Sequence, residues 1–199
     1  MFIIGLTGSL GMGKSTTARL FAEQGVPVHD ADAVVHRLYE GEAAAAIEAA
    51  FPGATAHGKV DRNRLAALVL DDPAALKRLE GIVHPLVQAA ERKLLAQAQA
   101  RGEKVALLDI PLLLETGGDQ RVDAVVVASA PVEVQQARVL VRPGMTWEKL
   151  EAILRKQMPD EEKRRRADFV VDTSRGIDAA RAQVRAILDA VATMPRRRR

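Results

Sequence analysis

The sequence predicts an α/β fold in which helices cover both faces of a parallel sheet. Short apolar runs of strand length alternate with segments whose apolar residues recur at helical spacing. The chain also begins as strand, glycine-rich loop, helix and strand, which is the order of a βαβ unit. An alanine-rich helical block over residues 31–103 is too long for a simple crossover. We interpret it as an insertion that could build a substrate site.

Local signals define the opening elements. The apolar run Phe2–Thr7 predicts a buried strand. Apolar residues at helical spacing predict a helix over Ser15–Gln24, which Gly25 ends. A second strand is predicted at Val26–His29.

Glycines and prolines divide the helical block. The segment Gly53–Gly58 breaks the helical pattern. Asp72 and Pro73 predict a helix start, with the aspartate as cap and the proline in the first turn. Pro85 similarly predicts the start of another helix, and His84 before it is expected to be extended, because proline disfavours the helical conformation in the preceding residue.

The second half of the chain returns to alternating strands and helices. In chain order, the predicted elements are strands at Lys104–Asp109 and Ala124–Ala128, a helix at Pro131–Leu140, a charged helical stretch from Thr146 to about Arg166, a short strand at Phe169–Asp172 and a closing helix at Ile177–Ala192.

The composition excludes several classes of protein. Hydrophobic residues make up 48% and charged residues 28% of the 199 positions, which rules out a wholly disordered chain. There is no cysteine, so disulfides, thiolate metal sites and cysteine nucleophiles are excluded. No apolar stretch approaches the roughly 20 residues of a membrane span, and the N-terminus lacks the basic region of a signal peptide. We therefore expect a cytoplasmic protein without a membrane partner.

The positive charge is concentrated at the C-terminus. The net charge is +3, and Arg196–Arg199 contribute +4, which leaves −1 on the rest of the chain (+3 minus +4). We expect the tail at residues 195–199 to be disordered and solvated. Aromatic residues are only 3% of the chain, so few rings could stack on bases, and no nucleic-acid partner is predicted.

The segment Gly8–Ser15 fits the phosphate-loop pattern G-x-x-x-x-G-K-[ST]. Glycines let backbone N–H groups turn toward phosphate oxygens, and the helix that follows presents its positive N-terminus to the same anion. In this pattern Lys14 reaches the β- and γ-phosphates, and the Ser15 hydroxyl holds Mg²⁺.

Three acidic residues follow predicted strands. Asp109 ends the strand that starts near Lys104, where a carboxylate can support Mg²⁺, although strands often end in aspartate. Asp30 and Asp32 follow the second strand, and in an extended segment both would point to the same side. They could then serve a metal ion and an acceptor hydroxyl; alternatively, one of them caps the next helix.

Two basic clusters lie in the second half. Arg138 and Arg142 are one helical turn apart, before a Pro-Gly turn, and one of them is expected to close over a transferring phosphoryl group. Lys163–Arg166 form a second cluster, and charges on helix surfaces are usually solvated. The histidines are not paired at the spacing of metal ligands.

The complete set of motifs resembles the dephospho-CoA kinases over nearly the whole chain. The residues that carry the resemblance are Ile4–Gly8 with the glycine loop, Asp30-Ala31-Asp32, Val60–Arg62 with Leu65, Leu79-Glu80, His84-Pro85, Pro111–Glu115, Gln135, Arg138, Arg142, Gln157, Lys163 and Ala167-Asp168. The P-L-L-x-E motif at Pro111–Glu115 is much more specific than the phosphate loop. Two departures are the loop interior (Ser9, Leu10 and Met12) and Asp172-Thr173, which stands where the family usually has an asparagine.

The resemblance implies a P-loop kinase core with a five-stranded parallel sheet, a helical coenzyme-binding part over residues 61–101 and a lid over residues 140–160, all in one domain. ATP, with Mg²⁺, would donate its γ-phosphoryl group to the ribose 3′-hydroxyl of dephospho-CoA. The implied catalytic residues are Asp32 as base, Lys14 and Arg142. The implied ATP-binding residues are Gly8, Gly11, Met12, Gly13, Lys14, Ser15, Thr16 and Arg138. The implied acceptor residues are Asp30, His84, Pro85, Pro111, Leu112 and Glu115, and the implied metal-binding residues are Ser15 and Asp109.

Two other functions are compatible with the loop alone. One is a different small-molecule P-loop kinase, acting on a nucleoside or a sugar. The other is a nucleic-acid-binding ATPase that uses the arginine tail. We expect a monomer or a weak homo-oligomer.

Overall fold

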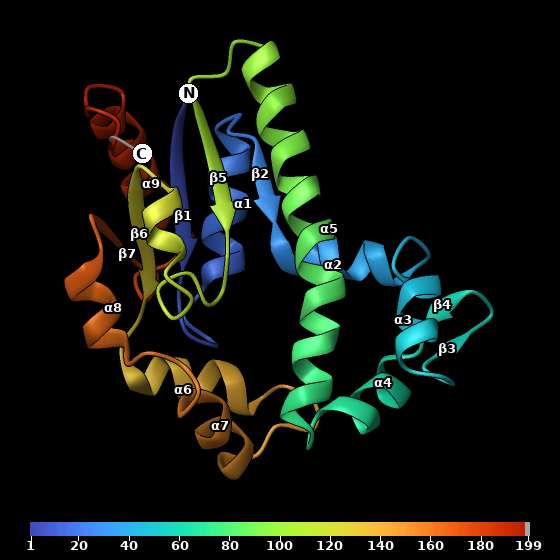
Figure 1. Ribbon diagram of the computed structural model, residues 1–199. Helices are drawn as coiled ribbons and strands as arrows, with labels where there is room; N and C mark the ends of the chain where they lie inside the picture. The colour runs from blue at the N-terminus through green and yellow to red at the C-terminus, as the bar shows by residue number, and fades with distance from the viewer. Residues whose placement is uncertain (198–199) are drawn as a thin grey trace. The chain divides into compact units, whose positions relative to one another are not determined.

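The computed structural model describes residues 1–197 and has the predicted five-stranded parallel sheet (Figure 1). The strands are β1 (Phe2–Thr7), β2 (Val28–Asp30), β5 (Val105–Asp109), β6 (Ala124–Ser129) and β7 (Phe169–Asp172). Their order is β2-β5-β1-β6-β7, with the first strand of the chain at the centre. The loop after β1 therefore lies at the middle of the carboxyl edge, where open parallel sheets bind ligands.

The central strand β1 is buried along its whole length. It pairs in parallel with β5 and β6, so that Ile4 stands opposite Leu107 on one side and Ala124 on the other. A strand covered on both faces needs apolar side chains in both directions, which explains the unbroken apolar run at the N-terminus.

Helices α1 (Lys14–Glu23) and α9 (Ile177–Val191) contact each other and cover one face of the sheet (Figure 1). Their fully buried residues Phe21 and Val184 belong to the same apolar cluster as Ile4 and Val126 of the strands. The remaining elements of this unit are a 3₁₀ turn (Gly118–Arg121), α6 (Val132–Leu140), α7 (Trp147–Leu154) and α8 (Asp160–Arg166).

Residues Asp30–Gln97 form a second compact unit, and the first consists of Met1–His29 and the chain from Ala98 onward. The elements of the second unit are α2 (Ala31–Tyr39), α3 (Ala44–Ala50), the hairpin β3 (Thr55–Ala56) with β4 (Lys59–Val60), α4 (Arg62–Val69) and most of α5 (Pro73–Ala100). It has its own apolar core, which includes Leu38, Ile47, Phe51 and Leu79. This unit agrees with the insertion expected over residues 31–103.

The predicted helix boundary at Pro85 is wrong. Helix α5 runs through His84 and Pro85 without a break. A proline inside a helix lacks its N–H and typically costs about 3 kcal/mol relative to alanine. Here Val83 on one side of the proline and Val87 on the other pack against the same core, so burial on both sides outweighs the local preference.

The charged stretch at residues 146–166 is two helices rather than one. Helix α7 ends at Leu154 and α8 begins at Asp160. The break precedes Pro159, whose ring disfavours a helical conformation in Met158. Pro159 directly precedes the first residue of α8, a position that suits proline, so it marks the start of the second helix.

The C-terminal tail is described as far as Arg197, and residues 198 and 199 lie outside the described residues. The Arg197 guanidinium donates to both carboxylate oxygens of Asp168, at 2.8 and 2.9 Å. Disorder of residues 195–199 stays a prediction. Among residues 1–197, no helix combines the length and the apolar character that a membrane crossing requires.

Replacing Pro85 by alanine should stabilise the protein, because the new N–H can complete the helical ladder of α5. We expect the free energy of unfolding to rise by about 1–2 kcal/mol, since the entropy that proline removes from the unfolded chain offsets part of the gain. Urea unfolding followed by circular dichroism measures this change.

Gly81→Ala, one turn earlier, calibrates the result. A Cβ at Gly81 meets nothing within 4 Å, so we expect a gain of about 0.5–1 kcal/mol from helix propensity alone. A loss of stability in Pro85→Ala would show that the helix needs the proline at this position.

Candidate active site

The phosphate loop at residues 8–15 joins β1 to α1, and the side chains of Val139 and Thr173 pack closely against it. Gly11 and Gly13 have φ angles of +80° and +88°, which side chains rarely adopt. A Cβ at Gly11 would lie 2.4 Å from Cγ2 of Val139, and one at Gly13 would lie 2.9 Å from Oγ1 of Thr173. The glycines are thus required both by backbone conformation and by the approach of neighbouring side chains.

Arg138 and Thr173 hold the second half of the loop. The Arg138 guanidinium donates to the carbonyl oxygen of Thr173 at 2.7 Å and to its hydroxyl at 2.9 Å. The same hydroxyl donates to the carbonyl oxygen of Met12 at 2.8 Å. Thr173, one of the two residues that stand where the family usually has an asparagine, therefore links α6 to the loop. No local pattern predicts this contact, because 161 residues separate Met12 from Thr173.

Two glutamines hold the first half of the loop. The Leu10 N–H donates to Oε1 of Gln157 at 3.1 Å, and the Leu10 carbonyl accepts from Nε2 of Gln135 at 2.7 Å. Gln135 is on α6, and Gln157 precedes α8. The N–H and the carbonyl of Leu10 are therefore both held by side chains, which come from two separate segments.

The loop lysine is paired with the acid at the end of β5. Nζ of Lys14 lies 2.7 Å from Oδ1 of Asp109, whose side chain is 1% exposed. The pair forms because β1 and β5 are parallel neighbours whose carboxyl ends meet at one edge. Ser15 is exposed in the first turn of α1. A hydroxyl and a carboxylate at this edge are the hard oxygen donors that Mg²⁺ prefers.

The acid of the P-L-L-x-E segment already has partners within the chain. Oε1 of Glu115 accepts the Met158 N–H at 2.8 Å and lies 2.8 Å from Nζ of Lys163. Burial raises the pKa of the Glu115 carboxyl, but the adjacent Lys163 ammonium and the hydrogen bond from the Met158 N–H outweigh burial, and the pKa is lowered overall. Glu115 is therefore an ionised link between the P-L-L-x-E segment and α8.

The rest of the P-L-L-x-E segment follows the end of β5. The carbonyl oxygen of Pro111 accepts the hydroxyl of Thr7 at 2.8 Å, which ties the segment to the end of β1. Leu113 and Leu114 are buried, whereas Leu112 is 40% exposed. Leu112 is thus the leucine of this motif whose side chain is available for a ligand.

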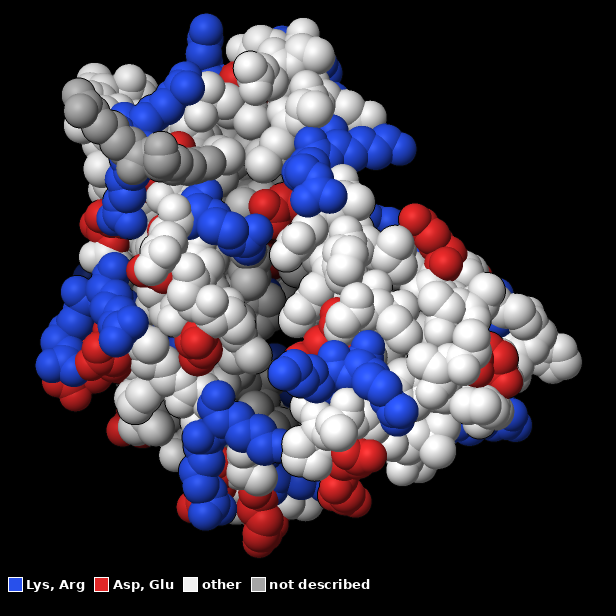
Figure 2. Space-filling view, viewed as in Figure 1, with Lys and Arg blue, Asp and Glu red and all other residues white. Residues whose placement is uncertain are grey.

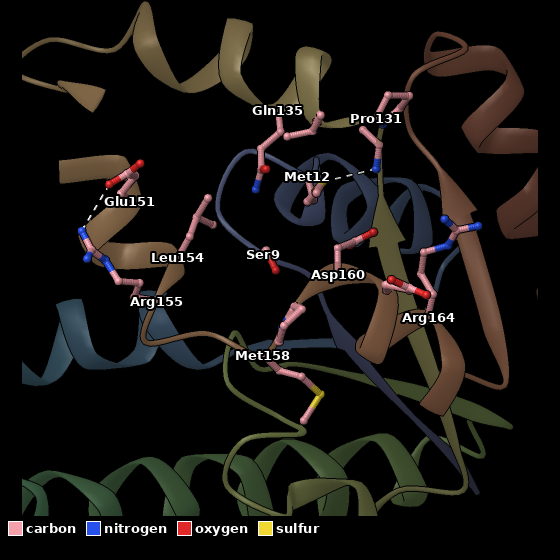
Figure 3. Close-up of a pocket in the computed structure, with 14 residues that line it drawn as sticks. Ser9, Met12, Pro131, Gln135, Glu151, Leu154, Arg155, Met158, Asp160 and Arg164 are labelled. Atoms are coloured by element: carbon pink, nitrogen blue, oxygen red, sulfur yellow. Dashed lines mark hydrogen bonds and ion pairs between the residues drawn. The ribbon is translucent and has the colours of Figure 1, made fainter. Parts of the chain in front are cut away.

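Beside the loop is a cavity of about 870 Å³. Ser9 and Met12 line it from the loop, Gln135 from α6, Leu154 from the end of α7 and Met158 from the segment between α7 and α8 (Figure 3). Its lining comes from segments scattered along the chain, so no local motif predicted it.

Comparisons with known proteins agree with this geometry. The family profile described as dephospho-CoA kinase matches residues 2–179. The chain belongs to the dephospho-CoA kinase family. A dephospho-CoA kinase from Rhodopseudomonas palustris is 64% identical over 198 residues, covering 100% of both chains.

Solved structures agree on the fold. A protein from Thermus thermophilus superposes with a TM-score of 0.83 and 39% identity, covering 97% of this chain and 98% of that one. A shikimate kinase from Acinetobacter baumannii has a TM-score of 0.54 and 20% identity, covering 97% and 94% of the two chains. The predicted P-loop kinase fold is therefore confirmed.

In this dephospho-CoA kinase family member, Asp30 at the end of β2 and Asp32 two residues later have different surroundings. The premise of an extended segment is wrong, because α2 begins at Ala31. Asp30 accepts the Ala33 N–H at 2.9 Å and caps the helix, which is the alternative that the sequence left open. Asp32 lies in the first turn of α2 and is exposed.

The remaining predicted residues fall in both units. His84 and Pro85 are exposed on α5 of the inserted unit. Arg142 is exposed in the turn after α6, and its side chain has no hydrogen-bond or ion-pair partner within residues 1–197. Lys163 is fully buried, unlike the solvated cluster that the sequence suggested.

The lowered pKa of Glu115 predicts a pH-dependent contribution to stability. A carboxyl whose pKa is lowered by folding stabilises the folded state above its ordinary value of about 4.5, and this contribution is lost as the pH falls through the folded value. We expect Glu115→Gln to lose about 3 kcal/mol of unfolding free energy at pH 7, because a buried ammonium loses its counter-charge. The difference from the unaltered chain should shrink steadily below pH 4.5.

Urea unfolding at a series of pH values makes this comparison. Glu151→Gln, which removes a carboxylate from the exposed pair with Arg155, is the matched control and should change stability little. A pH-independent difference for Glu115→Gln would contradict the ionised link.

Proposed function

We propose that this chain transfers the γ-phosphoryl group of ATP to the ribose 3′-hydroxyl of dephospho-CoA, giving CoA and ADP. The observation that carries the proposal is the family match over residues 2–179. The 64% identity to a full-length dephospho-CoA kinase supports the choice of acceptor.

The phosphate loop supports the choice of donor. Helix α1 begins after Gly13 with no side-chain cap among the described residues and no acid in its first turn. Its first N–H groups are therefore free to bind an anion at the positive end of the helix. Lys14 adds a cation at the same point. The proposed ATP contacts are Gly8, Gly11, Met12, Gly13, Lys14, Ser15, Thr16 and Arg138.

Mg²⁺ fits the oxygen donors at this edge. We assign it to the Ser15 hydroxyl and the Asp109 carboxylate, because the buried Asp109 is a charged oxygen ligand beside the loop lysine. When bound with ATP, Mg²⁺ neutralises charge on the β- and γ-phosphates.

The acceptor residues are proposed individually, from the resemblance to the family. The Asp32 carboxylate would accept the proton of the ribose hydroxyl and orient its oxygen toward the phosphorus. The proposed acceptor contacts are Asp30, His84, Pro85, Pro111, Leu112 and Glu115. Because the carboxylates of Asp30 and Glu115 are engaged within the chain, their proposed role is to position neighbouring groups.

Arg142 is proposed to stabilise the charge on the transferring group. Its side chain is free of intramolecular partners in the described chain, so it can reach an incoming phosphate without breaking a contact. We propose that residues 140–160 act as a lid that brings it there, and that residues 61–101 bind the coenzyme. We further propose a monomer or weak homo-oligomer acting in the cytoplasm without a nucleic-acid partner.

A panel of acceptors tests the proposal. We expect Mg-ATP turnover to rise at least a hundredfold on addition of dephospho-CoA, with CoA as the product identified by mass spectrometry. Adenosine, a sugar and shikimate serve as control acceptors. Equal stimulation by a nucleoside or a sugar would instead favour another small-molecule kinase.

Asp32→Asn should abolish most of the transfer while leaving binding intact. The amide keeps the size of the carboxylate but cannot take the proton, so we expect turnover to fall by roughly 10²–10⁴. Calorimetric affinities for Mg-ATP and dephospho-CoA should stay within several-fold of those of the unaltered chain.

Asp30→Asn is the matched control, two residues away. An asparagine can still cap α2, so we expect a small change in stability and a small change in turnover. Turnover within a few-fold of normal in Asp32→Asn would remove Asp32 from the role of base.

A further inference from the structure

Lys163 is a buried charged group that the proposed reaction does not use. Its side chain is fully buried, whereas the next three residues, Arg164–Arg166, are exposed. Figure 2 shows basic and acidic side chains intermingled over the outer surface of α8, at the left. An ammonium taken out of water is strongly unfavourable unless a counter-charge compensates it. A specific partner must therefore explain why this one cation of the cluster points inward.

That partner is Glu115, and the pair does more than hold α8. The oxygen that lies 2.8 Å from the Lys163 ammonium also accepts the Met158 N–H. The ammonium therefore holds Oε1 of Glu115 in place, and this oxygen in turn holds the backbone N–H of Met158. Without the cation, the largely buried carboxylate would keep only backbone N–H donors and would move toward water or take up a proton.

Met158 is covalently next to Gln157, which reaches the phosphate loop. The Gln157 side chain accepts the Leu10 N–H, and Gln135 donates to the Leu10 carbonyl from the other side. Figure 3 shows Gln135 on α6 and Met158 on the segment before α8, around the loop that carries Ser9 and Met12. Leu10 lies between Gly8 and Gly11, so its peptide orientation sets those of its neighbours.

We infer that Lys163 is a positioning residue for the phosphate loop: through Glu115, the Met158 N–H and Gln157, it sets the orientation of the Leu10 backbone and so of the N–H donors that receive phosphate. The inference rests on the proposed function, because it states what controls the ATP side of that site. Lys163 touches neither substrate; it acts through three intervening contacts.

A purely structural role of the Lys163–Glu115 pair predicts a different result. If the pair only stabilises α8, replacing both charges with apolar groups should preserve stability and nucleotide binding together, because such replacements are often neutral or stabilising. If the pair positions the loop, the same replacement keeps the fold but weakens nucleotide binding.

The decisive variant is therefore Glu115→Leu combined with Lys163→Met, in the full chain. Urea unfolding measures stability, and calorimetry with Mg²⁺ and a non-hydrolysable ATP analogue measures binding without the acceptor. We expect the urea midpoint to stay close to that of the unaltered chain and the dissociation constant of the analogue to rise about tenfold, which corresponds to about 1.4 kcal/mol. An unchanged dissociation constant would overturn the inference.

Single variants test whether the contacts of Lys163 and Gln157 act in one series. We expect Lys163→Met and Gln157→Leu each to raise the dissociation constant of the ATP analogue about tenfold. The variant that combines these two changes should bind the analogue no more weakly than the more affected single variant, because both residues act through the same series of contacts. Arg165→Met, which removes an exposed cation from the same helix, should leave binding unchanged. A hundredfold loss in the double variant would show independent effects and contradict the inference.

Failure of the proposed function is distinguishable from failure of this inference. An unaltered chain that binds the ATP analogue but does not phosphorylate dephospho-CoA would overturn the acceptor. The binding measurements would still decide the role of Lys163, because they contain no acceptor.

Discussion

The close approach of the phosphate loop to α6 and to the residue after β7 is the constraint on which the rest of the site depends. The loop has no room for a side chain at Gly11 or Gly13, since Val139 and Thr173 occupy that space. Its backbone is thereby held in one shape, and contacts from Arg138, Thr173 and the two glutamines add to that hold. A preorganised set of donors needs no reordering when a phosphate arrives, which is how such loops favour charge at a reacting centre.

The strands could be predicted from the sequence because each signal is local. A parallel strand covered on both faces must be apolar throughout, so Phe2–Thr7 and Ala124–Ala128 were visible as short apolar runs. The helices were predicted well where glycine or proline marks a real boundary. They were predicted poorly where tertiary packing overrides the local preference, as at Pro85, whose neighbours on both sides are held by one core.

The site could be predicted in part, for a related reason. The phosphate-loop pattern is contiguous, and its position between β1 and α1 is confirmed. The roles of Thr173, Gln157 and Lys163 depend on contacts between distant segments, and spacing along the chain carries no information about them. Lys163 also sits among exposed arginines, so its burial is set by the position of Glu115 rather than by the charge pattern of its helix.

The inserted unit has a consequence for how this chain could diversify. It is one continuous segment, Asp30–Gln97, with its own apolar core, and the chain enters and leaves it once. A recombination event that exchanged this segment would leave the pairing of β1 with β5 and β6 untouched, because none of those strands belongs to it. Mutations in the core of the inserted unit likewise change a different apolar cluster from the one that covers the sheet. The inserted segment can therefore change in sequence without rebuilding the strand pairs that carry the phosphate loop.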